Sequence, residues 1–190
     1  MRNREPILDV LRQVLPPHGC LLEIASGTGE HAAYMAPRLA CISWQPSDAD
    51  PAALGEIDAV ARASGCARIL PALELDAADA HWPIARADAM FCCNMIHIAP
   101  WSAAQGLFAG AARLLPASSP LVLYGPFKRN GIHTAPSNAQ FEAWLKALDT
   151  RYGVRCLDSE VLPLAAANGF VLADIITMPA NNLSVIWRRS

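Results

Sequence analysis

The residues with the clearest chemical potential form a glycine-rich turn near the start of the chain. In "LLEIASGTGEHAAYMA" (21–36), an apolar run reaches Glu23, a Ser-Gly-Thr-Gly turn follows, and a helical pattern comes next. Gly27 and Gly29 permit backbone angles that other residues avoid, and they let a ligand approach the main chain. Unpaired N–H groups at the start of the helix could hold a phosphate or a carboxylate. The turn therefore predicts a site for a mononucleotide, a dinucleotide or S-adenosylmethionine (SAM).

Neighbouring residues discriminate among these three ligands. A mononucleotide loop would need the pattern G-x-x-x-x-G-K-[ST], and no lysine stands here. Gly27, Gly29 and Ala32 fit the dinucleotide fingerprint. Asp48, about twenty residues further on, suits the ribose hydroxyls of either NAD or SAM. Glu23 favours SAM, because a buried carboxylate needs a partner such as an ammonium or sulfonium group and would repel a pyrophosphate.

The elements that must position this turn alternate between strand and helix. We predict strands at 20–25, 40–44, 68–75, 87–93, 120–124, 170–177 and 183–188, and helices at 5–15, 28–39, 51–64, 102–115, 137–148 and 159–168. Such alternation indicates an α/β fold with a parallel sheet covered by helices on both faces. About five residues separate the last two strands, and a parallel crossover needs a dozen or more, so one strand near the edge must be antiparallel.

Composition limits the classes of protein to which the chain can belong. Its 190 residues, 53% of them hydrophobic, fit a single domain over 1–190. The net charge of −2 gives no basic surface for nucleic acid or an anionic membrane. No apolar run approaches the roughly 20 residues of a membrane span. Six cysteines without a C-x-x-C pair indicate free thiols in a reducing cytosol, and we expect a cytoplasmic protein without a bound metal.

The motif "EIASGTGEH" resembles motif I of the class I SAM-dependent methyltransferases, and the similarity extends over essentially the whole chain. It implies a Rossmann-like, seven-stranded, mostly parallel sheet with an antiparallel last strand and helices on both faces. It also implies SAM as the methyl donor and S-adenosylhomocysteine as the product. A closer resemblance, to the methyltransferase-like protein 26 family and its bacterial relatives, rests on "RNREPIL", "EIASGTGEHA", "WQPSDAD", "NMIHIAPW", "YGPFKRNG", "SN" and "MPANN". That family implies the fold and the cofactor class, but no particular substrate.

The resemblance assigns cofactor roles to residues at the ends of four strands. It places six residues around the methionine part of SAM: Glu23, Ala25, Ser26, Gly27, Thr28 and Gly29. Asp48 would accept hydrogen bonds from the ribose, with Asp50 as the competing acid and the expected cap of the next helix. Asp76 would contact adenine, cap a following helix, or do both. Asn94 and Met95 would lie beside the transferring methyl group.

The motif "NMIHI" resembles small-molecule methyltransferases more than the N-P-P-Y type that methylates exocyclic amines of bases. His97 could act as a general base, because the ordinary pKa of histidine is near neutral. The alternative is a histidine that hydrogen-bonds its loop and holds Trp101 in place. Asn181 and Asn182 predict a turn between the last two strands, and their amides could also serve a pocket.

Two further segments are expected near the substrate. The loop at 124–137 is rich in Gly and Pro, and loops at this edge of a sheet often determine specificity. Its candidates for lining a pocket are Tyr124, Phe127, Asn130 and His133. The alternative is an ordered surface connection. At the N-terminus we expect Arg2, Asn3 and Arg4 to fold over the cofactor as a lid, with a frayed terminus as the alternative.

Together these patterns predict a SAM-dependent methyltransferase that acts on a small molecule, at oxygen. Methyl transfer from a sulfonium is an in-line displacement, so the protein mainly positions the reactants and excludes water. Two alternatives stay open: a non-catalytic SAM-binding or scaffold protein, and an NAD-dependent oxidoreductase, against which Glu23 and the terminal strand pair argue. A protein as the methyl acceptor is a further open alternative. The sequence indicates neither the acceptor nor the oligomeric state.

Overall fold

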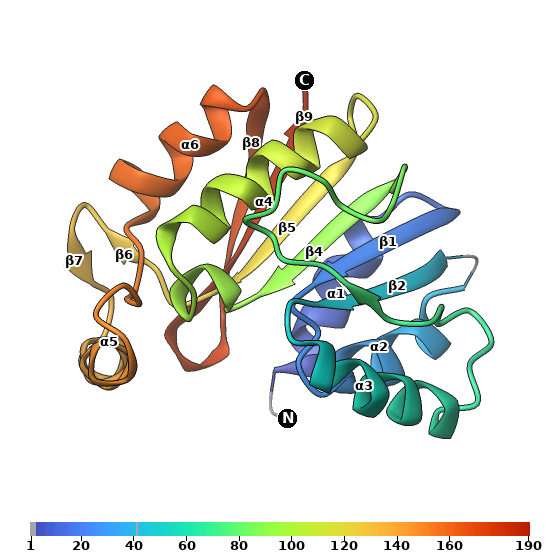
Figure 1. The fold of residues 1–190 in the computed structure, drawn as a ribbon. Coiled ribbons are helices and arrows are strands. Elements are labelled where there is room, and N and C mark those ends of the chain that lie inside the picture. Colours follow the sequence, from blue (N-terminus) through green and yellow to red (C-terminus); the bar gives the residue numbers. More distant parts are fainter. Residues whose placement is uncertain (1–2, 41) are drawn as a thin grey trace.

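The computed structural model describes residues 3–40 and 42–190, and its central element is a seven-stranded sheet (Figure 1). The strand order is β3-β2-β1-β4-β5-β9-β8. The strands are β1 (Gly19–Ile24), β2 (Ile42–Asp48), β3 (Leu73–Glu74), β4 (Ala89–Cys93), β5 (Pro120–Gly125), β8 (Phe170–Met178) and β9 (Asn182–Arg189). Strands β1 to β5 are parallel, whereas β9 is antiparallel to both of its neighbours, β5 and β8. The predicted α/β class and the antiparallel last strand are confirmed.

Six helices are present in the described residues (Figure 1). They are α1 (Arg4–Val14), α2 (Glu30–Met35), α3 (Pro51–Ala63), α4 (Trp101–Leu114), α5 (Pro136–Leu148) and α6 (Leu162–Ala167). One core cluster joins α4 and α6 to one face of the sheet, and a second joins α1 and α2 to the other face. No helix in residues 3–40 and 42–190 is long and apolar enough to cross a membrane.

The two cores follow from the two-residue alternation of side chains along each strand. Leu21 in β1 and Phe91 in β4 pack under α1 and α2, while Leu22 and Met90, their neighbours in sequence, pack under α4. All four side chains are fully buried. The central strands are therefore apolar on both faces, as a parallel sheet between two helical layers requires.

Local interruptions shorten several predicted elements. The third strand was expected over 68–75, but only Leu73–Glu74 pairs as a strand, with an isolated pairing of Ile69 to Trp44, because Pro71 interrupts it. The helix expected over 28–39 gives six residues of α2 and then a 3₁₀ turn, Ala36–Arg38, that contains a proline. The helix expected over 159–168 begins as a π-helical turn, Leu157–Val161, before α6.

The sequence did not predict a small hairpin, β6 (Lys128–Arg129) and β7 (Ile132–His133), between β5 and α5. Three hydrogen bonds from the Arg129 guanidinium to the Asp158 carboxylate, 3.0 to 3.1 Å long, hold the hairpin against the π-helical turn. In Figure 1 the hairpin and α5, seen end-on, lie beyond the edge of the main sheet. Loop 124–137 is thus an ordered element that carries α5 toward the carboxyl edge of the sheet.

Gly106 in α4 tests how tightly the loop after β3 is packed. A methyl group at Gly106 would collide with the carbonyl oxygen of Ala77, whereas one at Gly55 in α3 would meet nothing within 4 Å. We expect Gly106→Ala to lower the free energy of unfolding by roughly 1–3 kcal/mol through overpacking. Gly55→Ala should raise it by about 0.5–1 kcal/mol through helix propensity. Urea unfolding would measure both, and equal effects would contradict the packing of α4 against this loop.

Candidate ligand-binding site

A buried carboxylate lies beneath the glycine turn. Glu23 is 1% exposed, and its Oε2 accepts hydrogen bonds from the Ser26 hydroxyl (2.9 Å) and the Trp44 indole N–H (2.8 Å). Ser47 in β2 closes the arrangement, since its N–H donates to Ser26 Oγ and its hydroxyl donates to the Glu23 carbonyl. The other carboxylate oxygen, Oε1, lies 3.6 Å from His31 Nδ1 and has no hydrogen-bond donor among the described residues. Glu23 thus anchors the turn from below and keeps one acceptor position free.

The turn itself adopts backbone angles that favour glycine. Ala25, Gly27 and Gly29 have φ values of 58°, 59° and 75°, and for the alanine this conformation is strained. Gly27 is exposed, and a side chain there would meet nothing within 4 Å. Gly29 is buried, and a Cβ there would lie 3.1 Å from the Ile57 backbone. The first glycine leaves open space for a ligand, and the second allows α2 and α3 to approach.

The two competing acids after β2 have separate positions. Asp48 Oδ2 accepts the N–H of Gly27 at 2.9 Å, and its Oδ1 accepts the N–H of Asp50 at 3.1 Å. Asp50 instead caps α3, because its Oδ1 accepts the N–H of Ala52 at 2.9 Å ahead of Pro51. Asp48 is therefore the acid at the turn, and Asp50 is the expected helix cap.

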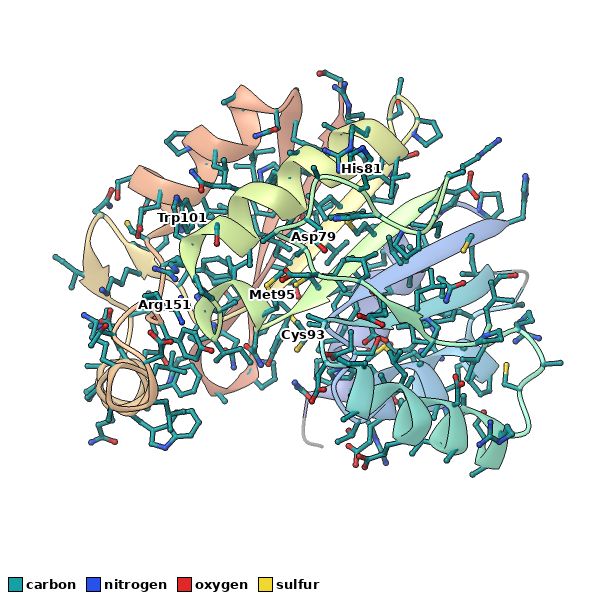
Figure 2. The ribbon with its side chains drawn as sticks, viewed as in Figure 1. Asp79, His81, Cys93, Met95, Trp101 and Arg151 are labelled. Atoms are coloured by element: carbon teal, nitrogen blue, oxygen red, sulfur yellow. The ribbon has the colours of Figure 1, made fainter. Side chains whose placement is uncertain are left out.

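A first cavity, of about 450 Å³, opens beyond the ends of β2 and β3. It is lined by Ala49, Glu74, Asp76, Asp79, His81, Trp82 and Pro83. Asp76 Oδ1 accepts the N–H of Ala78 at 2.8 Å within a turn, and no helix follows, so the helix-cap interpretation is wrong. Figure 2 labels Asp79 and His81 on this loop. We call this space, which is rich in carboxylates, the acidic cavity.

The end of β4 lies next to the turn, because β4 pairs directly with β1. Asn94 adopts the left-handed conformation (φ 61°), and its N–H donates to the Tyr124 carbonyl at 2.8 Å. Met95 follows in a 3₁₀ turn and is buried. Figure 2 shows Cys93 and Met95 close together at this point of the molecule. Burial raises the pKa of the Cys93 thiol, so this residue stays protonated.

His97 occupies a different place from the one expected of a general base. Its side chain is fully buried and stacks edge-on against Phe127 at 4.9 Å. Its Nδ1 accepts the Arg155 N–H at 3.2 Å, and a side chain at Gly125 would collide with its Nε2. Burial, together with the nearby Arg155 charge, lowers its pKa to about 3. A neutral, enclosed ring favours the interpretation that His97 holds its loop.

Arg155 also supports the loop after β4 and contacts Trp101. Its guanidinium donates to the carbonyls of Ile96 and Ala99, each at 2.9 Å, and lies 5.4 Å from the Trp101 ring centroid. The segment after β4 is therefore fixed by a cation on a distant loop. Sequence spacing gave no signal for Arg155.

Two of the residues expected to line a substrate pocket, Asn3 and Tyr124, lie at the carboxyl edge of the sheet. Tyr124 is the penultimate residue of β5, and the amides of Asn3 and Asn182 lie beside its hydroxyl. Burial raises the pKa of that hydroxyl, and these amides partly oppose the shift. Asn3 Oδ1 is buried and has no donor among the described residues. Arg2, the third residue expected there, lies outside the described residues.

Three other candidates lie elsewhere. Phe127 is fully buried against His97, so its side chain does not line a pocket. The sequence did not predict this burial, because a short loop has no periodicity that would indicate it. Asn130 lies at the tip of the β6–β7 hairpin, where its N–H donates to Asp158 at 2.6 Å. His133 Nε2 lies 2.7 Å from a Glu142 oxygen. None of the three lines the acidic cavity or the cavity between α5 and the β8–β9 connection.

The start of α1 is held in place. The Arg4 guanidinium lies 4.0 Å from the centroid of the Tyr34 ring in α2, and the Arg38 guanidinium lies at the same distance from that ring. Glu5 accepts a hydrogen bond from the Tyr34 hydroxyl. The described part of the N-terminal segment is thus tied to α2 and reaches Tyr124.

A second cavity, of about 290 Å³, opens between α5, the β8–β9 connection and the ends of β4 and β5. It is lined by Asn94, Pro126, Ser137, Asn138, Phe141, Ala180, Asn181 and Asn182. We call it the amide cavity. Sequence reasoning missed Asn138 and Phe141, and the polar first turn of α5, "PSNAQ", was the available signal. The adjacent Asn181 and Asn182 do reach a pocket, as one interpretation of the pair expected.

Comparison with known families gives one match over nearly the whole chain. Residues 1–189 match the family model described as "Protein of unknown function (DUF938)". No group of three or more His, Cys, Asp or Glu residues suited to a metal ion occurs within residues 3–40 and 42–190.

Solved structures similar to this chain share its fold. An O-methyltransferase family 2 protein from Planctomyces limnophilus, solved with apigenin, has a TM-score of 0.83 and 20% identity over 99% of this chain and 56% of its own. A putative O-methyltransferase from Nostoc punctiforme gives 0.84 and 15%, over 98% and 55%. CalO1, a methyltransferase in calicheamicin biosynthesis solved with S-adenosylhomocysteine (SAH), gives 0.76 and 15%, over 98% and 54%. This chain spans little more than half the length of these proteins, and at such identities the likeness shows the fold.

The buried His97 makes stability depend on pH in a definite direction. Its folded-state pKa of about 3 lies below that of an unfolded histidine, about 6.5, so acid protonates the unfolded chain first. The contribution of neutral His97 is present above pH 6.5 and is lost as the pH falls toward 3. Between pH 7 and 5, the wild type should lose about 2 kcal/mol more unfolding free energy than His97→Gln, at 1.36 kcal/mol per pKa unit. Urea unfolding at both pH values measures this, and parallel losses would show that the ring is not enclosed.

Proposed function

Because this chain belongs to the DUF938 family, described as proteins of unknown function, we propose its activity from its own site: a SAM-dependent methyltransferase that methylates oxygen on a small molecule. One observation carries the proposal. The open turn at Gly27 follows β1, the acidic cavity lies beyond β2 and β3, and the amide cavity lies beyond β4 and β5. The turn thus lies between two cavities at the point where the strand order reverses, which is where such sheets bind ligands.

The polar groups of this edge fit SAM in one orientation. Asp48, beside the acidic cavity, would accept hydrogen bonds from the ribose and direct adenine toward Asp76. The methionine part would then cross the turn and bring the sulfonium toward Asn94 and Met95. Glu23, with one oxygen free of donors, would favour the two positive charges of SAM from below the turn. A pyrophosphate in the same place would be repelled by that carboxylate.

The residues of this chain would act by position more than by proton transfer. Bound SAM would supply an activated methyl group. The Gly27 backbone and Asp48 would fix its orientation, and the loop held by Arg155 would shape the side on which the acceptor lies. No described residue that lines the amide cavity is an Asp, Glu, His or Lys, so the acceptor proton would leave to water. Alignment and exclusion of bulk water account for rate acceleration in such a site.

The comparisons support the finer parts of the proposal. The similar structures include proteins titled as O-methyltransferases and one with SAH bound. On the resemblance of its motifs, we also propose that this chain is related to the methyltransferase-like protein 26 family. A cytoplasmic location is part of the proposal too, in keeping with free thiols at Cys20, Cys66, Cys92, Cys93 and Cys156. We propose a small molecule as the partner, and no nucleic acid.

Calorimetry with SAM and with NAD tests the proposed function. We expect SAM to bind the wild type and Gly27→Val to abolish binding, because the branched side chain would fill the ligand's space and disfavours positive φ. Gly131→Val is the matched control, since Gly131 also has positive φ (80°) and open space but lies in the β6–β7 hairpin. NAD binding without SAM binding, or unchanged SAM affinity in folded Gly27→Val, would overturn the proposal.

Turnover separates an enzyme from a scaffold. Labelled SAM incubated with the protein and a metabolite extract should transfer its label to a small molecule. Repeated absence of transfer despite tight SAM binding would favour the non-catalytic SAM-binding protein instead.

The two acids after β2 should respond differently to substitution. Asp48→Ala should weaken SAM binding by about 1–3 kcal/mol, because buried hydroxyls lose a charged acceptor. Asp50→Ala should leave the affinity unchanged and lower the unfolding free energy by about 1 kcal/mol, because α3 loses its cap. Calorimetry and urea unfolding of both variants measure this, and the reverse pattern would assign the ribose to Asp50.

A further inference from the structure

We propose that the amide cavity binds the methyl acceptor as an uncharged, planar molecule held through its own O–H or N–H donors. The inference rests on the proposed function, because it assigns the acceptor side of that site. It depends on the charge of the cavity walls, the orientation of their amide groups and their apolar surfaces.

Charge is the first constraint. None of the described residues lining the amide cavity carries a charged side chain, although the acidic cavity has three carboxylates, Glu74, Asp76 and Asp79. A carboxylate or ammonium ligand would find no opposite charge among these residues, and the part of it that the cavity covers would lose water without compensation, at a cost in free energy. An uncharged ligand avoids that cost. The two cavities thus suit different chemistries.

Amide orientation is the second constraint. Asn138, 5% exposed, donates through Nδ2 to Thr134 Oγ1 and to the Asn181 carbonyl, both at 3.0 Å. Asn182 Nδ2 donates to the carbonyls of Pro179 and Ala180, both at 3.2 Å. Because each nitrogen faces at least one carbonyl oxygen, which can only accept, flipping either amide would lose a hydrogen bond to that carbonyl. Their Oδ1 atoms accept no hydrogen bond from the described residues, so the walls offer acceptors.

The free amide oxygens of Asn138 and Asn182 favour a ligand with donors, since a ligand that offered only acceptors would leave these two oxygens unpaired. Phe141 and Pro126 supply the apolar surface of the cavity. An aromatic wall favours a flat ring, which can stack on it or meet its edge. The matching acceptor is a small aromatic compound that carries hydroxyl or N–H groups.

This chemistry agrees with a site that lacks a base. A hydroxyl that donates to an amide oxygen keeps a lone pair for the methyl carbon. The new O–C bond forms as the C–S bond breaks, sulfur keeps the bonding electron pair, and the hydroxyl proton leaves to water. The amide oxygen orients the acceptor but takes no proton, because amides are very weak bases.

Side-chain amide NMR of the full chain, with and without SAH, tests the inference. The probes are catechol, its donor-free analogue 1,2-dimethoxybenzene, benzoate and benzylammonium. We expect catechol to shift the NH₂ signals of Asn138 and Asn182 saturably and to bind at least tenfold more tightly than the other three. Equal binding of 1,2-dimethoxybenzene would overturn the role of donors. Tighter binding of benzoate or benzylammonium, or no binding of catechol, would overturn the cavity assignment.

A charge substitution gives a second readout. Asn182→Asp places a carboxylate in the cavity and should reverse the preference, so that benzylammonium binds about tenfold more tightly than catechol. Gln140→Glu, an equal change of charge on an exposed part of α5, should leave the ranking unchanged. If circular dichroism shows that Asn182→Asp is unfolded, Asn138→Asp replaces it. An unchanged ranking in a folded cavity variant would contradict the inference.

The outcomes for the cavity and for the enzyme can be told apart. Probe ranking is measured without SAM, and SAM binding is measured without probes. If the protein ranks the probes as expected but does not bind SAM, the proposed methyltransferase function is wrong and the proposed ligand class of the amide cavity stands. A protein that transfers labelled methyl groups to benzoate and not to catechol would show the opposite.

Discussion

The buried carboxylate of Glu23 is the constraint on which the ligand site depends. One of its oxygens accepts hydrogen bonds from the Trp44 indole and the Ser26 hydroxyl. Ser47 in β2 hydrogen-bonds both the Ser26 hydroxyl and the Glu23 carbonyl. A charge this deep is tolerated because strong hydrogen bonds replace water. The consequence is geometric: the end of β1, the turn and the end of β2 form one polar unit, so Asp48 reaches the Gly27 N–H without help from the ligand.

The site is asymmetric about this unit. Toward β2 and β3 it is acidic, and toward β4 and β5 it is neutral and lined with amides. The neutral half depends on long-range support, since Arg155 holds the loop after β4 and α5 carries Asn138 to the β8–β9 connection. His97 belongs to that support, because its ring fills the space that a side chain at Gly125 would need.

Sequence reasoning reached the parts of this structure that local rules govern. The alternation of elements and the short final connection predicted the sheet correctly, and the glycine turn after a buried strand indicated the candidate ligand site. It missed the parts that tertiary packing decides. Pro71 broke a strand that apolar content favoured, and Phe127 turned inward onto His97 from a loop without periodicity. Asn138 reached the site because α5 packs beside the β8–β9 connection, which helical spacing alone does not show.

The placement of β9 between β5 and β8 has a kinetic consequence. During synthesis, the outer edge of β5 stays unpaired until residues 182–189 have left the ribosome, because β9 alone covers it in the finished sheet. An exposed apolar edge of this kind invites association between nascent chains. The same late strand pair brings Asn181 and Asn182 to the amide cavity. A nascent chain that has formed the glycine turn therefore has the residues of the acidic cavity before it has those of the amide cavity.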